Sequence, residues 1–343
     1  MGEYVSVRGF TLVELCAGAG GQALGLELAG FEHEALVEID RHAVATLRLN
    51  RPDWNIVEGD VKDFSGLPHR GLDLLSAGVP CPPFSKAGKQ LGQDDDRDLF
   101  PEALRIVEET EPSAVMFENV RGLLDDQFAE YRTALNGRLE SLGYRVFWRL
   151  LNAVDFGVPQ LRPRVVIVGL KPPYAEHFVW PDPLKQRLVT VGDALHSEMV
   201  SRGWQGADAW RSNAQTIAPT LVGGSKKHGG PDLGPTRAKR AWAKLGVNGH
   251  TIAEEPPEMD FEGLPRLTIK MAATIQGFPE TWGFSGRKTA AYRQVGNAFP
   301  PPVARAVGLS IRHALEMQGV KNPPPVRSTE QASQTHFFAK LAS

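Results

Sequence analysis

The chain has 343 residues, 42% of them hydrophobic, so it can bury one large core and a smaller second lobe. Its formal net charge of -2 excludes a polycation that binds nucleic acid over its whole surface, so any such contact must be local. The two cysteines form neither a disulfide framework nor a zinc site, and no signal peptide or membrane-length apolar run is present, which predicts a cytoplasmic protein without bound metal.

Strand and helix patterns alternate through the first half of the chain, which predicts an α/β fold with a parallel sheet covered on both faces. Strand patterns lie at residues 11–15, 35–40, 55–57, 72–77 and 113–120, and another strand ends at Gly169. Helical patterns lie at 22–29, before Asn50 and at 99–110, and two more are expected at 267–275 and 302–314.

The composition of the sequence changes after Lys171, where Gly, Pro, Ser and Trp become more frequent and the hydrophobic periodicity of strands and helices weakens. We therefore expect a first lobe over residues 1–170 and a loop-rich second domain over 171–265. A segment over 266–318 is expected to return to the first lobe, and the tail over 319–343 to be disordered.

Residues 78–85 read Gly-Val-Pro-Cys-Pro-Pro-Phe-Ser and follow an apolar strand pattern. Prolines on both sides of Cys81 remove backbone donors, so this stretch cannot continue as a helix or as a central strand. In open α/β sheets the loops after such strands hold ligands and reacting groups, which favours a displayed thiol. A free cysteine at a strand end can also be a small hydrophobe, and the motif alone leaves that alternative open.

A carboxyl group and two arginines lie at other strand ends. Glu118 ends an apolar strand and faces the same crevice as Cys81 if the two strands are neighbours. Arg162 and Arg164 precede a strand at alternate positions, and a period of two sends both to one face. Together these segments predict a thiolate, a carboxyl and a paired cation at one rim of the sheet. Helix capping by Glu118 and ordinary surface charge are the alternatives.

A glycine-rich turn follows the first strand. Gly18-x-Gly20-x-x-Ala23, with Glu38 twenty residues beyond Gly18, satisfies the dinucleotide-binding fingerprint, so a nicotinamide-dependent oxidoreductase is a competing interpretation. S-adenosyl-L-methionine would use the same turn, but it carries a sulfonium instead of a pyrophosphate and tolerates acids around it. Asp60 at the third strand end suits an adenine amino group as acceptor, or is an ordinary turn residue.

Four motifs occur in the order found in one family: the Pro-Cys loop, Glu118-Asn119-Val120, Gln160-x-Arg162-x-Arg164 and Gln294-Val295-Gly296-Asn297. The chain resembles a bacterial-type DNA (cytosine-5)-methyltransferase over roughly residues 10–170 and 266–315. The resemblance implies a Rossmann-like S-adenosylmethionine-dependent methyltransferase sheet, with a smaller target recognition domain at 171–265. The enzyme would transfer a methyl group to carbon 5 of a flipped-out cytosine in a specific double-stranded DNA sequence.

The resemblance also implies a role for individual residues. Cys81 would add to carbon 6 of cytosine, Glu118, with a raised pKa, would donate a proton to ring nitrogen 3, and Arg162 or Arg164 would supply a cation. Cofactor contacts are expected at Cys16, Ala17, Gly18, Ala19, Gly20, Glu38, Ile39, Asp60, Val61, Pro80, Leu99 and Asn297. The family commonly has an aromatic residue at the position of Cys16, Phe at that of Val79 and Gln at that of Pro82.

The second domain contains a local basic stretch, with six Lys and Arg against the single acid Asp232 between residues 226 and 244. Such a stretch is often only a solvated face, but its position favours phosphate contacts. The expected DNA contacts are Ser85, Lys89, Gln90, Lys226, Lys227, Arg237, Lys239 and Arg240. A monomer is expected, with a cognate restriction endonuclease as a candidate partner in a bacterial, nucleoid-associated setting. A tRNA cytosine-5 methyltransferase and a nucleic-acid-binding member without activity remain alternatives.

Overall fold

The computed structural model describes residues 9–80, 98–185, 187–223 and 230–317. The chain divides into two compact units: the first holds Met1–Leu151, Pro163–Asp182 and Val303–Glu316, and the second holds Asn152–Arg162, Pro183–Pro302 and Met317–Ser343. These bounds differ from the expected 1–170, 171–265 and 266–318. Residues 152–162 join the second unit, 171–182 join the first, and of the segment expected to return to the first lobe only 303–316 does so, whereas 266–302 stays in the second unit. The functional domain assignment stays a prediction, and the tail from 319 lies outside the described residues.

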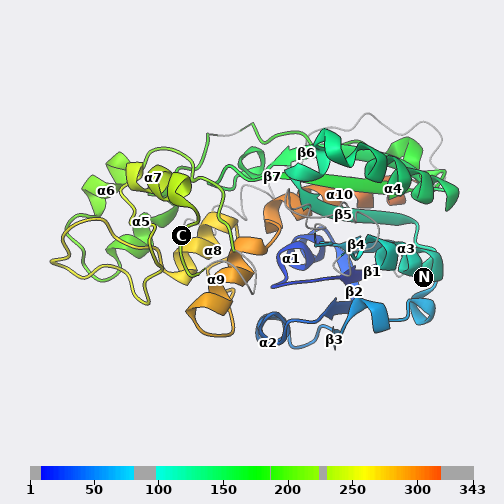
Figure 1. Ribbon diagram of the computed structural model, residues 1–343, viewed down its shortest axis with the longest axis horizontal. Coiled ribbons are helices and arrows are strands. Elements are labelled where there is room, and N and C mark those ends of the chain that lie inside the picture. Colours follow the sequence, from blue (N-terminus) through cyan, green and yellow to red (C-terminus); the bar gives the residue numbers. More distant parts are fainter. Residues whose placement is uncertain (1–8, 81–97, 186, 224–229, 318–343) are drawn as a thin grey trace, which may run out of the picture. The chain divides into compact units, whose positions relative to one another are not determined.

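The first unit is built on a seven-stranded sheet with the order β3-β2-β1-β4-β5-β7-β6 (Figure 1). The strands are β1 (Phe10–Leu15), β2 (Phe31–Glu38), β3 (Ile56–Glu58), β4 (Leu74–Ala77), β5 (Ala114–Val120), β6 (Arg145–Asn152) and β7 (Pro163–Leu170). β1 to β5 pair in parallel, as the alternating pattern predicts. β7 runs antiparallel to β5, so the expectation of a parallel sheet is wrong at this edge. The α/β class itself is confirmed.

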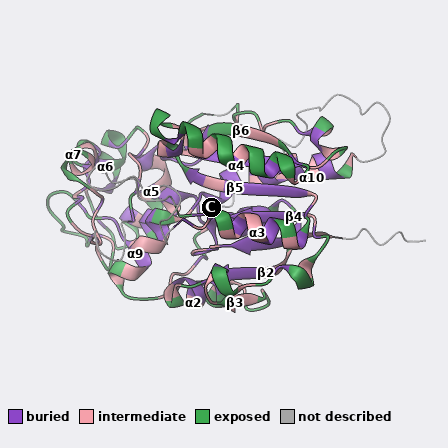
Figure 2. Ribbon diagram, turned by 45° about the vertical axis from the view of Figure 1, so that its right-hand side comes forward, coloured by how far each residue is buried: buried purple, intermediate pink, exposed green. Residues whose placement is uncertain are grey.

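Helices cover both faces of this sheet. They are α1 (Gly21–Leu28), α2 (Arg41–Asn50), α3 (Phe100–Thr110), α4 (Ala129–Ser141) and α10 (Pro301–Glu316). Side chains alternate along each strand, so Val13 and Leu15 point to the core under α3 and α4. Leu36 points to the other face, where it packs with Ala23 of α1 and Leu47 of α2. Figure 2 shows the resulting buried strands between helices whose outer faces are exposed.

Short 3-10 helices join these elements: η1 (Val61–Asp63), η2 (Leu67–His69), η3 (Arg121–Leu124), η4 (Asp126–Phe128), η5 (Ala153–Phe156) and η6 (Tyr174–His177). The sheet order reverses between β1 and β4, because the chain moves from β1 toward β3 in one direction and from β4 toward β7 in the other. Ligands of open α/β sheets bind at the carboxyl ends of strands at such a switch point. Leu15 and Ala77 end the two strands there.

The second unit contains α5 (Val191–Val200), α6 (Ala207–Asn213), α7 (Thr236–Lys244), α8 (Ile269–Gln276) and α9 (Lys288–Asn297). Its core includes Trp204, Trp210 and Trp242, each at most 6% exposed, so these indoles are packing residues. The helix expected at 267–275 corresponds to α8 and belongs to this unit, and α10, expected at 302–314, packs on α1 of the first unit. None of the helices within the described ranges is long and apolar enough to cross a membrane.

Candidate active site

The Cys81 segment begins at the switch point of the sheet. Cys81, Ser85, Lys89 and Gln90 lie outside the described residues, but the chain that leads to them is described. The Gly78 N–H donates to the Leu15 carbonyl at 3.3 Å, which ties the end of β4 to the end of β1. A Cβ atom at Gly78 would lie 3.6 Å from the carbonyl oxygen of Cys16 and 3.9 Å from Oε2 of Glu118. The backbone at Gly78, which is three residues before Cys81 in the sequence, therefore lies close to the Glu118 carboxylate.

Glu118 is held by an arginine on the neighbouring antiparallel strand. Nε of Arg164 lies 2.8 Å from Oε1 of Glu118, and both side chains are 12% exposed. The antiparallel direction of β7 explains this contact, because it brings the start of β7 to the end of β5, where Val120 pairs with Arg164. If β7 ran parallel to β5, the start of β7 would lie beside the start of β5, and Arg164 would be far from Glu118.

The next residue, Asn119, orders the backbone. Its side chain is 2% exposed, donates to the Val79 carbonyl at 3.1 Å and accepts the Val120 N–H at 2.8 Å. These bonds fasten the segment before Cys81 to β5. Pro80, a predicted cofactor contact, is exposed immediately after this anchor.

Arg162 does not share the environment of Arg164. Its side chain is 1% exposed and donates to the carbonyls of Leu221 at 2.7 Å, Gly296 at 2.8 Å and Ala298 at 3.0 Å. The expectation that both arginines form one paired cation at the rim is therefore wrong. Arg162 fastens the end of α9 within the second unit, whereas Arg164 binds a carboxylate in the first.

The glycine-rich turn after β1 is fastened by Glu38. One carboxylate oxygen of Glu38 accepts the Gly18 N–H and the other accepts the Asp40 N–H, each at 2.7 Å. Gly18 and Gly20 adopt φ values of 55° and 84°, and Gly20 precedes the first residue of α1. Burial raises the pKa of Glu38. The backbone of Ile39 also bonds to this carboxylate, so three backbone N–H groups fix its position in the turn.

Cys16 lies in the same turn with a φ of 54°, in the left-handed region that L-residues rarely adopt. Burial raises the pKa of its thiol to about 12, and the charges of Glu38, Asp60 and Glu14 add to the effect. The thiolate is the reactive form, so Cys16 is inert as a nucleophile at neutral pH. Its neighbours Ala17 and Ala19 are 6% and 2% exposed.

Three further predicted cofactor residues directly follow β2 and β3. Gly59, after β3, donates to the Glu38 carbonyl at 3.0 Å, and the next residue, Asp60, caps η1 by accepting the Lys62 N–H at 3.0 Å. Ile39, directly after Glu38, is 64% exposed. Val61 is 4% exposed and packs in the core, so only its backbone could face a ligand.

Leu99 and Asn297 belong to different units. Leu99 caps the start of α3 and packs against the core of the first unit. Asn297 ends α9 in the second unit, where a Cβ atom on Gly223 would lie 2.5 Å from its Oδ1 atom.

A family model described as C-5 cytosine-specific DNA methylase matches residues 10–313. The chain is a member of this family. It is 55% identical to the Type II methyltransferase M.NaeI of Lentzea aerocolonigenes over 91% of this chain and 77% of that protein. It is also 55% identical to the Type II methyltransferase M.NgoMIV of Neisseria gonorrhoeae over 90% of this chain and 99% of that protein.

Solved structures support the same fold. The Entamoeba histolytica methyltransferase EhMeth aligns over 90% of this chain and 99% of its own, with a TM-score of 0.62 and 13% identity. The S. pombe Dnmt2 methyltransferase aligns over 90% and 98%, with a TM-score of 0.59 and 17% identity. With the family shown, this DNA methylase is a DNA (cytosine-5-)-methyltransferase, and the nicotinamide-dependent alternative is wrong.

Sequence reasoning missed two buried polar side chains of this methylase. Glu14, the last residue but one of β1, is 1% exposed, and the hydroxyl of Ser76 donates to it at 3.2 Å. Burial raises the pKa of Glu14 to about 8, against hydrogen bonds from Ser76 and from the backbone of Ala23. Gln22 is 4% exposed, and its amide has no hydrogen-bond partner among the residues that the structure describes. An acid inside an otherwise apolar strand pattern was the available signal for Glu14.

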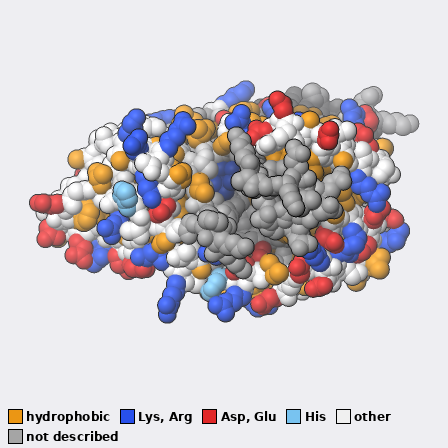
Figure 3. All heavy atoms as spheres, viewed as in Figure 1, with side chains coloured by type: hydrophobic (Ala, Val, Ile, Leu, Met, Phe, Trp, Pro, Cys, Tyr) orange, Lys and Arg blue, Asp and Glu red, His pale blue; other side chains and the backbone are white. Residues whose placement is uncertain are grey.

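The predicted DNA contacts of the methylase fall partly on α7. Lys226 and Lys227 lie outside the described residues. Arg237 and Arg240 are exposed one turn apart, whereas Nζ of Lys239 lies 3.1 Å from Oδ2 of Asp232. Figure 3 shows Lys and Arg side chains over the region of α7, with acidic side chains along the neighbouring edge. Lys239 is therefore tied to an internal partner, and the exposed arginines are the stronger candidates.

Proposed function

We propose that this enzyme transfers the methyl group of S-adenosyl-L-methionine to carbon 5 of a cytosine in a specific double-stranded DNA sequence. The ion pair of Glu118 and Arg164 carries the proposal, because it fixes a carboxyl group beside Gly78, three residues before Cys81. Family membership and the relatives M.NaeI and M.NgoMIV, both Type II methyltransferases, support the same activity.

In the proposed reaction, the Cys81 thiolate adds to carbon 6 of the ring and Glu118 donates a proton to ring nitrogen 3. This addition turns carbon 5 into an enamine carbon, which can attack an electrophilic methyl group. After transfer, carbon 5 loses its proton to a base, the bond between sulfur and carbon 6 breaks, and nitrogen 3 returns its proton to Glu118. Both ring faces must be reachable, so the cytosine leaves the duplex stack first.

Arg164 contributes to these reaction steps through Glu118. Its guanidinium presents donors in a rigid plane, so it orients the carboxyl group toward one side of the sheet edge. Asn119 plays a matching part for the Cys81 segment, because it fastens the Val79 carbonyl to β5. Glu118 and the described residues that lead to Cys81 are thereby both fastened at the end of β5.

The turn residues fit the proposed cofactor. A Cβ atom at Gly18 or Gly59 would meet no atom within 4 Å, so both glycines face open space. Glu38 offers acceptors for ribose hydroxyls, Asp60 for an adenine amino group, and the exposed Ile39 offers an apolar surface for an adenine face. When bound, S-adenosyl-L-methionine supplies the electrophilic methyl group. Leu99 is proposed to complete this part of the site in the first unit, and the cofactor contact of Asn297 stays a prediction.

We also propose that the enzyme is a monomer, that segment 171–265 recognises the target, and that a restriction endonuclease with the same target is its biological partner. The name Type II methyltransferase of the two relatives supports this setting. The bacterial cytoplasm as location stays a prediction.

The decisive experiment is bisulfite sequencing of DNA from a non-methylating host that expresses the chain. We expect protected cytosines at one recurring sequence, none in hosts that express Cys81→Ser at the same level, and fewer in hosts that express Glu118→Gln. Complete conversion of all cytosines in cells with folded wild-type protein would contradict the proposal. Protection in the Cys81→Ser cells would contradict the covalent mechanism.

A further inference from the structure

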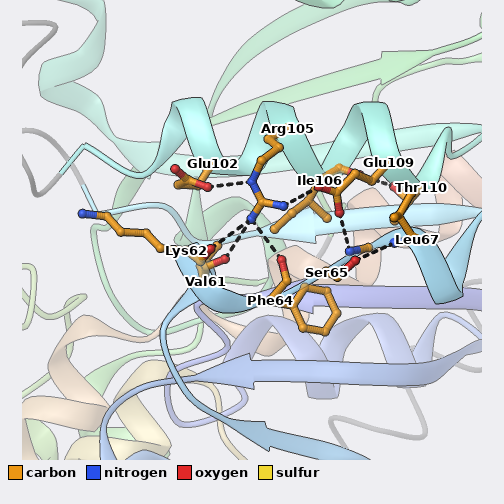
Figure 4. Close-up of polar contacts among 11 residues, drawn as sticks. Val61, Lys62, Phe64, Ser65, Leu67, Glu102, Arg105, Ile106, Glu109 and Thr110 are labelled. Carbon is orange, nitrogen blue, oxygen red and sulfur yellow. Dashed lines mark hydrogen bonds and ion pairs between the residues drawn. The ribbon is translucent and has the colours of Figure 1, made fainter.

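Arg105, in the middle of α3, binds partners on two different segments of the first unit (Figure 4). On its own helix, Nε donates to Glu102 at 2.8 Å and Nη1 to Glu109 at 2.5 Å. Its Nη2 atom reaches across to the carbonyls of Phe64 at 3.0 Å and Val61 at 3.2 Å. The side chain is 34% exposed and those of the two glutamates 28% and 21%, so the network is partly shielded from water.

The carbonyls that Arg105 binds belong to the turn that follows β3. Asp60 begins this turn, where its side chain accepts the Lys62 N–H and its carbonyl accepts the Asp63 N–H. Phe64 closes the turn by donating to the Val61 carbonyl. The Val61 carbonyl keeps a second lone pair beside its bond to Phe64, and a guanidinium can bind several carbonyls at once. Arg105 is thus the cap of the turn that Asp60 opens.

A second contact between α3 and this connection lies one turn further along the helix. Oε2 of Glu109 accepts the Gly66 N–H at 2.6 Å. Burial alone would raise the pKa of Glu109, but the hydrogen bonds from Gly66 and Arg105 outweigh it and the pKa is lowered. A Cβ atom at Gly66 would lie 2.7 Å from Cγ2 of Thr110, so the backbone approaches the helix as closely as glycine allows. Residues 61–66 are therefore fastened to α3 at both ends.

The first turn of α3 belongs to the candidate active site. Leu99 caps the helix, and the preceding Asp98 accepts the Phe100 N–H at 3.0 Å and the hydroxyl of Tyr131 through both carboxylate oxygens, at 2.9 and 2.8 Å. Arg105 lies six residues beyond Leu99, which is about 9 Å along a helix. α3 thus joins the end of the segment that contains Cys81 to the turn that contains Asp60.

We propose that Arg105 is a positioning residue that holds the Asp60 turn in place for the adenine of the cofactor. This inference rests on the proposed function, which assigns the adenine amino group to Asp60. Arg105 does not contact the cofactor itself. It fixes the backbone from which the Asp60 carboxylate projects, so its loss weakens the recognition of the adenine edge and leaves the methyl-transfer step nearly unchanged.

Replacing Arg105 by lysine distinguishes the hydrogen bonds of the guanidinium group from the effect of its positive charge. A lysine at position 105 keeps a positive charge near Glu102 and Glu109, but its single ammonium group cannot also cap the Val61 and Phe64 carbonyls. If Arg105 served only the ion pairs, Arg105→Lys would behave like the wild type. If the carbonyl cap matters, Arg105→Lys resembles Arg105→Gln.

The test measures binding of S-adenosyl-L-homocysteine and S-inosyl-L-homocysteine by calorimetry to the full-length chain. The inosyl analogue carries an oxygen where adenine carries its amino group, so the ratio of the two dissociation constants reports on Asp60. Arg138→Gln is the matched control, because Arg138 forms an exposed ion pair with Glu108, the neighbour of Glu109 on α3. Thermal unfolding of each variant is measured alongside.

We expect Arg105→Gln and Arg105→Lys to bind the adenosyl analogue about tenfold more weakly, as the loss of charged hydrogen bonds implies. The preference for the adenosyl analogue should shrink in both, the KM for the cofactor should rise with kcat nearly constant, and Arg138→Gln should match the wild type. An unchanged preference in folded Arg105→Lys, or an equal loss for both analogues, would overturn the inference. A wild type without preference would overturn the Asp60 contact itself, before any variant is measured.

Discussion

Arg164 and Glu118 face each other across the antiparallel pairing of β5 and β7, with 2.8 Å between Nε and Oε1 and 12% exposure on both sides. Such a pair is a strong orienting contact, because little water competes for either group. It also makes each partner depend on the other, since one charge left alone in this environment is costly.

We predict that Arg164→Leu destabilises the enzyme by about 3 kcal/mol, because it leaves the Glu118 carboxylate without its cation. Glu118→Gln, which keeps the shape, should lower kcat about 100-fold or more by removing the acid, with a smaller loss of stability. Urea unfolding and methyl-transfer assays measure the two effects. A double variant whose stability loss equals the sum of the single losses would show that the contact contributes nothing.

Much of the fold could be predicted because the strands are short apolar runs that end at Gly, Pro or acidic residues. β1, β2 and β4 therefore end at or shortly before the candidate residues Gly18, Glu38 and Gly78, as the sequence predicted. The direction of β7 could not be predicted, because strand direction depends on the connection and not on the residues within the strand. The contact between Glu118 and Arg164 followed from that direction.

The sequence also did not predict that Arg162 and Arg164 bind different partners. Alternation predicts a common face only where both residues lie in the same strand, and Arg162 precedes the first residue of β7. Its partners, the carbonyls of Leu221, Gly296 and Ala298, come from distant parts of the chain. Long-range partners of this kind leave no local pattern.

Cys81→Ser should abolish methylation and leave cofactor affinity nearly intact, because a serine hydroxyl is too weakly acidic to add to the ring at neutral pH. In DNA that contains 5-fluorocytosine, carbon 5 carries fluorine in place of the proton, so the elimination that releases Cys81 cannot occur. The wild type should therefore form an adduct that survives denaturation, visible as a shifted band on a gel, whereas Cys81→Ser should form none.

Cys16 provides the internal control for this prediction, because its thiol has a pKa of about 12. Alkylation of the native enzyme at pH 8 should modify Cys81 and spare Cys16, as peptide mass spectrometry would show. Preferential modification of Cys16, or turnover by Cys81→Ser above about a hundredth of the wild type, would rule out the covalent role of Cys81.

Glu14 should make stability depend on pH. Its pKa of about 8 in the folded state lies above the ordinary value of about 4.3, so its stabilising contribution is complete below pH 4.3 and is lost as the pH rises through 8. We expect the free energy of unfolding of the wild type to fall, relative to Glu14→Gln, by at most about 1.4 kcal/mol per pH unit in this window. Parallel urea curves for the two proteins from pH 5 to 8.5 would show that Glu14 does not titrate there.

Gly296 in α9 should not tolerate a methyl group. A Cβ atom there would lie 2.4 Å from the backbone nitrogen of Gly223 and 2.5 Å from its Cα atom, and a backbone cannot move aside as a flexible side chain can. Gly296→Ala should therefore destabilise the protein by about 2 kcal/mol or more, as overpacking does. Gly137→Ala, on the exposed side of α4 with nothing within 4 Å, is the control and should stabilise by up to about 1 kcal/mol. Equal melting temperatures for the two variants would contradict this reading of the close approach.

The exposed arginines of α7 should contact phosphates. Replacing Arg237 and Arg240 by Gln should weaken DNA binding and lower the slope of log affinity against log salt by about two units, one for each lost phosphate contact. Lys239→Gln should leave the slope unchanged, because that ammonium group is bound to Asp232 at 3.1 Å.

Cofactor affinity should not change in any of these variants, since Gly18, Glu38 and Asp60 belong to the first unit. Fluorescence anisotropy across a salt series makes the measurement. If the double arginine variant kept the wild-type slope, α7 would be an ordinary solvated helix face, and the phosphate contacts would have to be sought around Lys89, Lys226 and Lys227.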